Sequence, residues 1–207
     1  MNVEVHVTYK DHLPTVGIVA AICLFIVAAM HYPGGTTESA TTVGYSWTHN
    51  FISTLFVPRA LNGAANPARY YADAAMLFLC VSLAIIFRQI SLEIGPRVHK
   101  KTVEIGGIGS MVYGFLVVTP MHDLMVSIGL VFGLAALFAI THALYLERRR
   151  WLFGWGTICV VLSLVSAAMY YGDILYSYLP VVQKGSWVVW IAWLLGVYYT
   201  RSTPETE

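Results

Sequence analysis

The chain has 207 residues, of which 57% are hydrophobic and only 11% are charged, and its formal net charge is +1. An ordinary soluble domain carries about 25% charged residues, so this chain lacks the side chains needed to cover a globule in water. A net charge this small, with no basic domain, also excludes a nucleic-acid-binding protein. The composition therefore indicates a protein of the lipid bilayer.

Six apolar segments are each long enough to cross a hydrocarbon core of about 30 Å at a rise of about 1.5 Å per residue. Inside lipid the backbone must satisfy its own hydrogen bonds, which favours helices. The sequence thus predicts an all-α, polytopic membrane protein with six transmembrane helices in one bundle. The expected spans are residues 13–30, 70–87, 103–119, 124–146, 151–171 and 181–200.

Lysine and arginine residues are divided unequally between the two sides that six spans create. One side holds both termini and the loops 88–102 and 147–150, with nine bases: Lys10, Arg88, Arg97, Lys100, Lys101, Arg148, Arg149, Arg150 and Arg201. The other side has three, Arg59, Arg69 and Lys184. Basic loops mark the cytoplasmic side, so we expect a plasma (inner) membrane protein with both termini in the cytoplasm.

The first outer loop, residues 31–69, is expected to be long and structured. It opens with the turn-forming run His31-Tyr32-Pro33-Gly34-Gly35-Thr36. Residues 51–57 are apolar but too short to span, which predicts a helix at the membrane surface or a re-entrant helix. The pairs Asn62-Gly63 and Asn66-Pro67 are turn signals before the second span.

Polar and ionisable residues at the membrane edge are energetically costly and therefore worth testing as a site. In the predicted topology they gather on the outer side: His31, His49, Asn50, Arg69, Asp73, His122, Asp123, Asp173 and Lys184. They could share one outer pocket if the helices form a single bundle. Helix caps and snorkelling side chains are the alternative explanation.

The leading hypothesis is a pocket for a membrane lipid or a lipid-linked head group. Arg69 and Lys184 are the expected receivers of an anionic head group. Asp73, His122 and Asp123 are the expected orienting or acid–base catalytic residues. The remaining members of the ligand-binding set are His31, His49, Asn50 and Asp173.

Two other function classes stay open. A zinc-dependent membrane hydrolase needs three protein ligands and an activated water; the outer His and Asp residues offer the atoms, but HExxH and HxxxH are absent. A non-catalytic scaffold or accessory subunit is the other class, and the sequence identifies no protein partner.

Two kinds of chemistry are disfavoured. Haem ligation by His12 with His31, or by His122 with His142, would join residues about 30 Å apart along one helix. A nucleophile at Ser53, one turn after His49, lacks the G-x-S-x-G context.

Small and aromatic residues have ordinary structural interpretations. The pairs Gly106–Ser110 and Gly129–Gly133 are spaced for close helix packing. The outer tyrosines, Tyr170 and Tyr171 among them, fit an interfacial aromatic belt.

Several motifs together resemble a bacterial family of six-helix membrane proteins. They lie at residues 31–36, 44–50, 61–63, 66–69, 122–124 and 178–184. The family is catalogued as domain of unknown function nine hundred and ninety-eight, and the resemblance covers residues 13–200. It implies the same architecture, with the motifs on the outer face, and it implies no particular activity.

Overall fold

The computed structural model describes residues 9–200, and this part of the chain is built from six α-helices. They are α1 (Tyr9–His31), α2 (Ala68–Glu93), α3 (Arg97–Leu116), α4 (His122–Leu146), α5 (Arg150–Gly172) and α6 (Leu179–Tyr199). Two short 3₁₀ turns, η1 (Ile52–Leu55) and η2 (Tyr176–Tyr178), precede α2 and α6. The all-helical prediction is confirmed for these residues.

Five of the helices, α1, α2, α4, α5 and α6, are long and apolar enough to cross a membrane. Large apolar side chains on their outward faces are exposed, among them Leu13, Val131 and Trp151. A surface of this kind is unfavourable in water and suits lipid, which indicates a membrane-embedded protein. The first two turns of α3 carry Arg97, Lys100, Lys101 and Glu104, so α3 falls outside this set.

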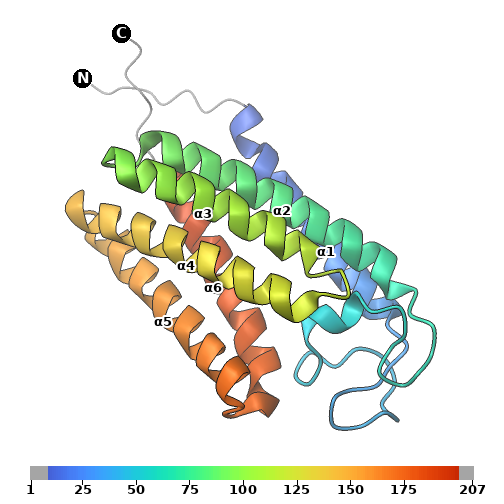
Figure 1. The fold of residues 1–207 in the computed structure, drawn as a ribbon. Coiled ribbons are helices and arrows are strands. Elements are labelled where there is room, and N and C mark those ends of the chain that lie inside the picture. The colour runs from blue at the N-terminus through green and yellow to red at the C-terminus, as the bar shows by residue number, and fades with distance from the viewer. Residues whose placement is uncertain (1–8, 201–207) are drawn as a thin grey trace.

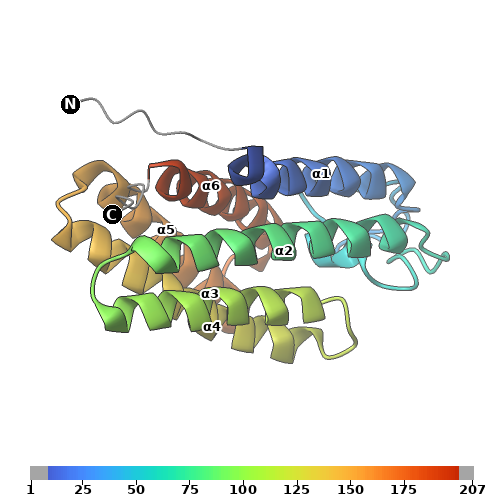
Figure 2. The ribbon, with the colours of Figure 1, turned by 90° about the horizontal axis from the view of Figure 1, so that it is seen from above.

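Successive helices lie side by side and run in alternating directions (Figure 1). Helix α3 packs between α2 and α4, while α5 packs on α4 and α6 on α5. Helix α6 also contacts α2, and α1 packs along α2 (Figure 2). Thr15 and His12 near the start of α1 hydrogen-bond to the hydroxyl of Tyr199 at the end of α6.

The bundle therefore has two distinct ends. We call the end with the start of α1 and the end of α6 the terminal end. The opposite end, with η1, the starts of α2, α4 and α6, and the end of α5, is called the loop end.

Helix α3 approaches both of its neighbours through glycine. A Cβ atom on Gly107 would lie 2.2 Å from Cγ of Phe87 on α2. A Cβ atom on Gly106 would lie 2.8 Å from the carbonyl oxygen of Phe132 on α4. Absent side chains let the backbones come this close, so α2, α3 and α4 form a tightly packed layer.

Helices α5 and α6 are joined by two tryptophans. The Trp193 indole is fully buried and donates its Nε1–H to the carbonyl oxygen of Leu152 over 2.9 Å. The Trp190 indole donates to the carbonyl oxygen of Cys159 over 3.2 Å. Because lipid offers no hydrogen-bond partners, these bonds satisfy both indoles inside the protein and hold the helices together.

The segment from 32 to 67 joins α1 to α2 at the loop end. Its apolar part forms a single 3₁₀ turn, η1, rather than the helix expected over 51–57. Pro58 directly follows Val57 and disfavours a helical conformation there, which explains the short turn. Leu55 and Phe56 are buried against the bundle, so this turn covers part of the loop end.

The helix bounds differ modestly from those expected. Helices α1, α2 and α5 extend beyond the predicted spans at both ends, whereas α4 begins two residues earlier and ends at the predicted residue 146. Helix α3 begins and ends earlier than 103–119, and α6 begins earlier than 181 and stops one residue before 200. Polar residues form the added turns, because the bounds of a helix follow its hydrogen bonds and not its apolar run.

Candidate functional site

A cavity of about 420 Å³ lies inside the bundle at the loop end. Five helices, α2 to α6, and the η1 turn line it, whereas no described residue of α1 does. Along α4 the lining extends from His122 to Leu137, a depth of roughly 20 Å at 1.5 Å per residue. The cavity is therefore elongated along the bundle axis.

The deep part of the cavity is apolar. Its floor includes Phe87, Leu137 and Leu194. Two serines in its wall satisfy their hydroxyls on their own helices: Ser110 donates to the Gly107 carbonyl and Ser163 to the Cys159 carbonyl, each over 2.8 Å. The hydroxyls of Ser166 on α5 and Ser186 on α6 lie 3.5 Å apart. A ligand there would meet mainly hydrocarbon surfaces.

Glycines on α3 and α4 form part of the cavity wall, and Gly114 leaves open space there. Gly114, Gly129 and Gly133 all line the cavity. A Cβ atom on Gly114 would come within 4 Å of a single described neighbour, Sγ of Cys80, at 3.7 Å. Because ordinary van der Waals contact begins near this distance, a larger side chain at this position would grow into open space.

The polar end of the cavity is built around the carboxylate of Asp123. Its Oδ1 atom accepts a hydrogen bond from the Tyr170 hydroxyl over 2.7 Å and lies 2.9 Å from Nδ1 of His122. The hydroxyls of Ser127 and Tyr171 are also hydrogen-bonded, at 2.7 Å. Of these residues, His122, Asp123, Tyr170 and Tyr171 line the cavity.

These tyrosines bridge two helices that separate. Helices α4 and α5 lie close together near their connecting turn and diverge toward His122 and Gly172 (Figure 1). Tyr170 and Tyr171 on α5 reach across to Asp123 and Ser127 on α4. The cavity is therefore bounded on this side by long hydrogen-bonded side chains.

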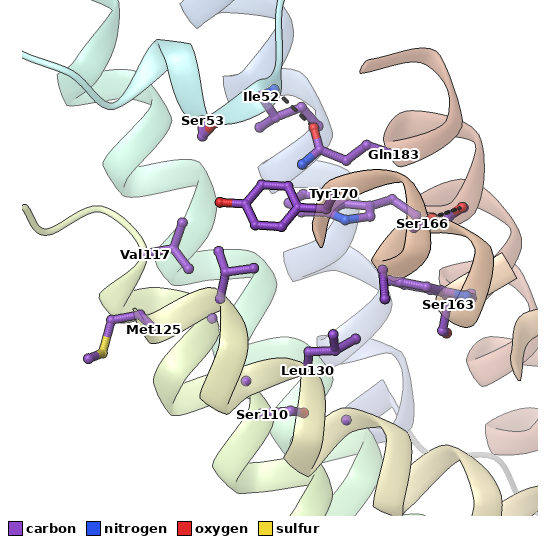
Figure 3. Close-up of a pocket in the computed structure, with 18 of the residues that line it drawn as sticks. Ile52, Ser53, Ser110, Val117, Met125, Leu130, Ser163, Ser166, Tyr170 and Gln183 are labelled. Atoms are coloured by element: carbon purple, nitrogen blue, oxygen red, sulfur yellow. Dashed lines mark hydrogen bonds between the residues drawn. The ribbon is translucent and has the colours of Figure 1, made fainter. Parts of the chain in front are cut away.

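The η1 turn closes the cavity from above. Ser53 lies in η1 and lines the cavity, and the Ile52 amide donates to Oε1 of Gln183 over 3.3 Å (Figure 3). Tyr170 lies across the middle of this view, with Ser110 and Leu130 farther from η1 (Figure 3). Ser53, Gln183 and Tyr170 are thus the polar residues of this view that lie toward η1.

Two of the nine candidate residues, His122 and Asp123, line the cavity, and the structure places the other seven elsewhere. The seven are His31, His49, Asn50, Arg69, Asp73, Asp173 and Lys184. Asp173 is exposed and ends α5 in a left-handed conformation with φ 52°. The shared pocket expected for all nine is therefore not formed.

Lys184 fastens the 32–67 segment to α6. Its Nζ atom donates to the carbonyl oxygens of Asn50 and Pro180 and lies 5.7 Å from the centre of the Tyr45 ring. Burial, and secondarily the nearby Tyr32, raise the pKa of Tyr45, so this phenol stays neutral at pH 7. The ammonium group is engaged by the protein itself.

Asn50 is fully buried and structural in its contacts. Its Oδ1 atom accepts the Ser46 amide over 2.9 Å, and its Nδ2 atom donates to the Gly35 carbonyl over 2.8 Å. His49 is exposed, with Nδ1 3.0 Å from the Ser46 hydroxyl and Nε2 3.8 Å from the Glu38 carboxylate. Both residues stabilise the fold of the 32–67 segment.

Arg69 and Asp73 lie one turn apart on α2, and Nε of Arg69 and Oδ1 of Asp73 are buried without a hydrogen-bond partner among the described residues. The Arg69 guanidinium lies 5.4 Å from the Tyr70 ring centre. Asp73 precedes Met76, the first α2 residue of the cavity lining, by one turn. His31 donates its Nδ1–H to the Val27 carbonyl oxygen over 2.9 Å and packs on Tyr71, with ring centroids 5.0 Å apart. These side chains lie at the loop end but outside the cavity.

The described residues contain no group of three or more His, Cys, Asp or Glu side chains placed to hold a metal ion. The three-ligand centre that a zinc hydrolase needs is therefore not assembled in this part of the chain. The histidines of the disfavoured haem pairs have other neighbours: His12 contacts Tyr199, and His142 lies 2.8 Å from His99.

Reasoning from sequence missed Gln183, Tyr170 and Tyr171 as site residues. Tyrosines are also typical of the aromatic belt at a membrane interface, and the spacing of these two does not distinguish site residues from belt residues. One usable signal was present: Asp123 and Ser127 are one turn apart on α4, and two consecutive tyrosines end α5.

No family model matches the chain, and no curated protein or solved structure is detectably similar to it. Membership of the six-helix family named above therefore stays a prediction. The cavity is the structural feature that bears on function.

Proposed function

We propose that this protein binds one lipid chain inside its helical bundle, with the polar end of the lipid at the loop end. The supporting observation is the cavity of about 420 Å³ with an apolar floor and a polar cluster at Asp123. Ligand cavities in proteins usually measure roughly 300–1,000 Å³ and combine apolar walls with a few polar groups.

Packing and polar contacts, rather than the hydrophobic effect, would drive this binding. A lipid chain that leaves the bilayer exchanges one hydrocarbon environment for another, so it gains little from burial alone. An unfilled apolar cavity, however, forfeits dispersion contacts along its whole wall. A chain of suitable length restores those contacts, and the polar cluster fixes its orientation.

We also propose that α3 is a sixth span. It packs along α2 and α4, and the start of α1 and the end of α6 meet at the terminal end, as an even number of crossings requires. Its charged first turns would lie at the membrane surface. Arg88, Arg97 and Arg149 lie toward the terminal end, which supports a cytoplasmic terminal end in the plasma membrane.

Two of the nine bases expected on the cytoplasmic side, Arg201 and the side chain of Lys10, lie outside the described residues. Membership of the six-helix family is part of the same proposal, because that family shares the six-span architecture. The loop end would then face the outer side of the membrane.

Filling the cavity tests the lipid proposal. Gly114→Leu places an isobutyl group in the cavity. Gly185→Leu is the matched control, because Gly185 lies outside the cavity lining and a Cβ atom there would have no described neighbour within 4 Å. Native mass spectrometry of the purified full-length chain should show a retained lipid that Gly114→Leu removes and Gly185→Leu keeps. Equal retention in both variants would contradict the proposal.

A further inference from the structure

The polar end of the cavity has an unusual charge balance for a site expected to bind lipid. Among the described residues that line it, none is lysine or arginine, and the single carboxylate is that of Asp123. Phosphate and carboxylate head groups are usually bound by Arg or Lys side chains. The cavity therefore lacks the Lys and Arg side chains that usually bind an anionic head group.

The lysine and arginine side chains at the loop end lie outside the cavity lining. Lys184 donates to the carbonyl oxygens of Asn50 and Pro180. The Arg69 guanidinium lies over the Tyr70 ring, 5.4 Å from its centre. Drawing Lys184 into the cavity would break its two hydrogen bonds, and a buried carbonyl left without its donor is costly. Lys184 is therefore structural in this arrangement.

The groups that do face the ligand both donate and accept hydrogen bonds. Gln183 accepts the Ile52 amide through Oε1, which leaves its Nε2–H₂ as a donor toward the cavity (Figure 3). Asp123 supplies acceptor atoms, and His122 keeps Nε2 after Nδ1 has bonded to Asp123. Ser53 and Tyr176 add hydroxyls to the same lining.

A hydroxyl group matches this mixture best, because it donates one hydrogen bond and accepts two. A carboxylate or phosphate only accepts and would lie close to the negative Asp123 carboxylate. An ammonium only donates, so it would leave the Gln183 amide without an acceptor. The donors and acceptors of the lining thus discriminate among three kinds of head group.

We infer that the cavity takes a single-chain lipid with an uncharged, hydroxylated head group, of the monoacylglycerol kind, and that Asp123 disfavours anionic lipids. This inference rests on the proposed function, since it specifies the head group of the same bound lipid. Asp123 and Gln183 would bond the hydroxyls, while the acyl chain extends between α4 and α6 toward Leu137 and Leu194.

Four lipids with matched oleoyl or oleyl chains compare the head groups: monoolein, oleate, oleoyl lysophosphatidate and oleylamine. Each is titrated into the full-length protein in a neutral detergent, with binding followed by native mass spectrometry. Monoolein should bind about fivefold more tightly than lysophosphatidate, because the Asp123 side chain is exposed and water screens its repulsion of a nearby like charge.

Two charge-neutralising variants make the test specific. Asp123→Asn keeps the acceptor for Tyr170 and should abolish most of the discrimination against lysophosphatidate. Asp173→Asn is the matched control, since Asp173 is exposed at the same end of the bundle and outside the cavity. It should leave the ratio of affinities unchanged.

The possible failures are distinguishable. Binding of none of the four lipids would refute the proposed function itself. Binding of all four with equal affinity, or tightest binding of an anionic lipid or of oleylamine, would leave the lipid cavity intact and overturn the head-group inference. Discrimination that persists in Asp123→Asn would also overturn it, because the selectivity would then arise elsewhere.

Discussion

The two halves of α3 use small residues to opposite effect. In the half toward the terminal end, Gly106 and Gly107 are in such close contact with α4 and α2 that a single Cβ atom would overlap Phe132 or Phe87. In the half toward the loop end, a Cβ atom on Gly114 would meet Cys80 at an ordinary 3.7 Å, and the space beyond is cavity.

The difference shows that a small residue on a membrane helix has two possible consequences. Where a neighbouring helix moves in, the backbones pack closely. Where the neighbour is held away, the missing side chain leaves a void. Here α5 is held against α6 by Trp193 near the terminal end and diverges from α4 toward the loop end (Figure 1), so the void remains at the loop end.

The largest effect is expected where the closed half is held together. Trp193→Ala removes a fully buried indole and its bond to Leu152, and should lower the free energy of unfolding by about 3–5 kcal/mol. Trp151→Ala is the control, since Trp151 is 80% exposed. Denaturant titration in detergent, followed by circular dichroism, compares them. Similar losses in both variants would mean that the terminal end is not tightly closed.

An intermediate effect is expected from adding one methyl group to the tight half of α3. Gly107→Ala should destabilise the fold by about 1–3 kcal/mol, because its Cβ overlaps Phe87. Gly114→Ala makes the same change in the open half and should be neutral or slightly stabilising. The same unfolding assay measures both. The contrast between the halves fails if Gly114→Ala costs as much as Gly107→Ala.

The smallest effect is expected at the bridge between α4 and α5. Tyr170→Phe removes the hydrogen bond to Asp123, whose side chain is 84% exposed, and should cost about 1 kcal/mol. Tyr178→Phe is the control on an exposed tyrosine. Thermal unfolding in nanodiscs is sensitive enough for this comparison. If the two variants match, the bridge contributes nothing to the loop end.

Sequence reasoning located the helices well because long apolar runs leave few alternatives in a bilayer. It located α3 least well, since Arg97 and Lys100 open that helix with polar turns. It overestimated the segment 51–57, where Pro58 limits the helix to one 3₁₀ turn. Helix ends depend on local hydrogen bonds that hydropathy does not contain.

The candidate site was predictable only in part. His122 and Asp123 were found because they start a helix at the membrane edge, and both line the cavity. Lys184 lies at the same depth but donates to the Asn50 carbonyl, and Arg69 lies over the Tyr70 ring outside the cavity. A sequence indicates how deep a residue lies in the membrane. The direction in which its side chain points around the helix axis depends on how the helices pack.

The central claim is that a lipid chain occupies the interior of the bundle. A monoacylglycerol with a photoreactive diazirine near the end of its acyl chain tests this directly, with cross-linked residues mapped by peptide sequencing. We expect labels at cavity residues such as Leu130 and Leu137 that an excess of monoolein abolishes, while labels at the outward-facing Val131 and Phe138 persist. Labelling confined to Val131, Phe138 and other outward positions would contradict the account.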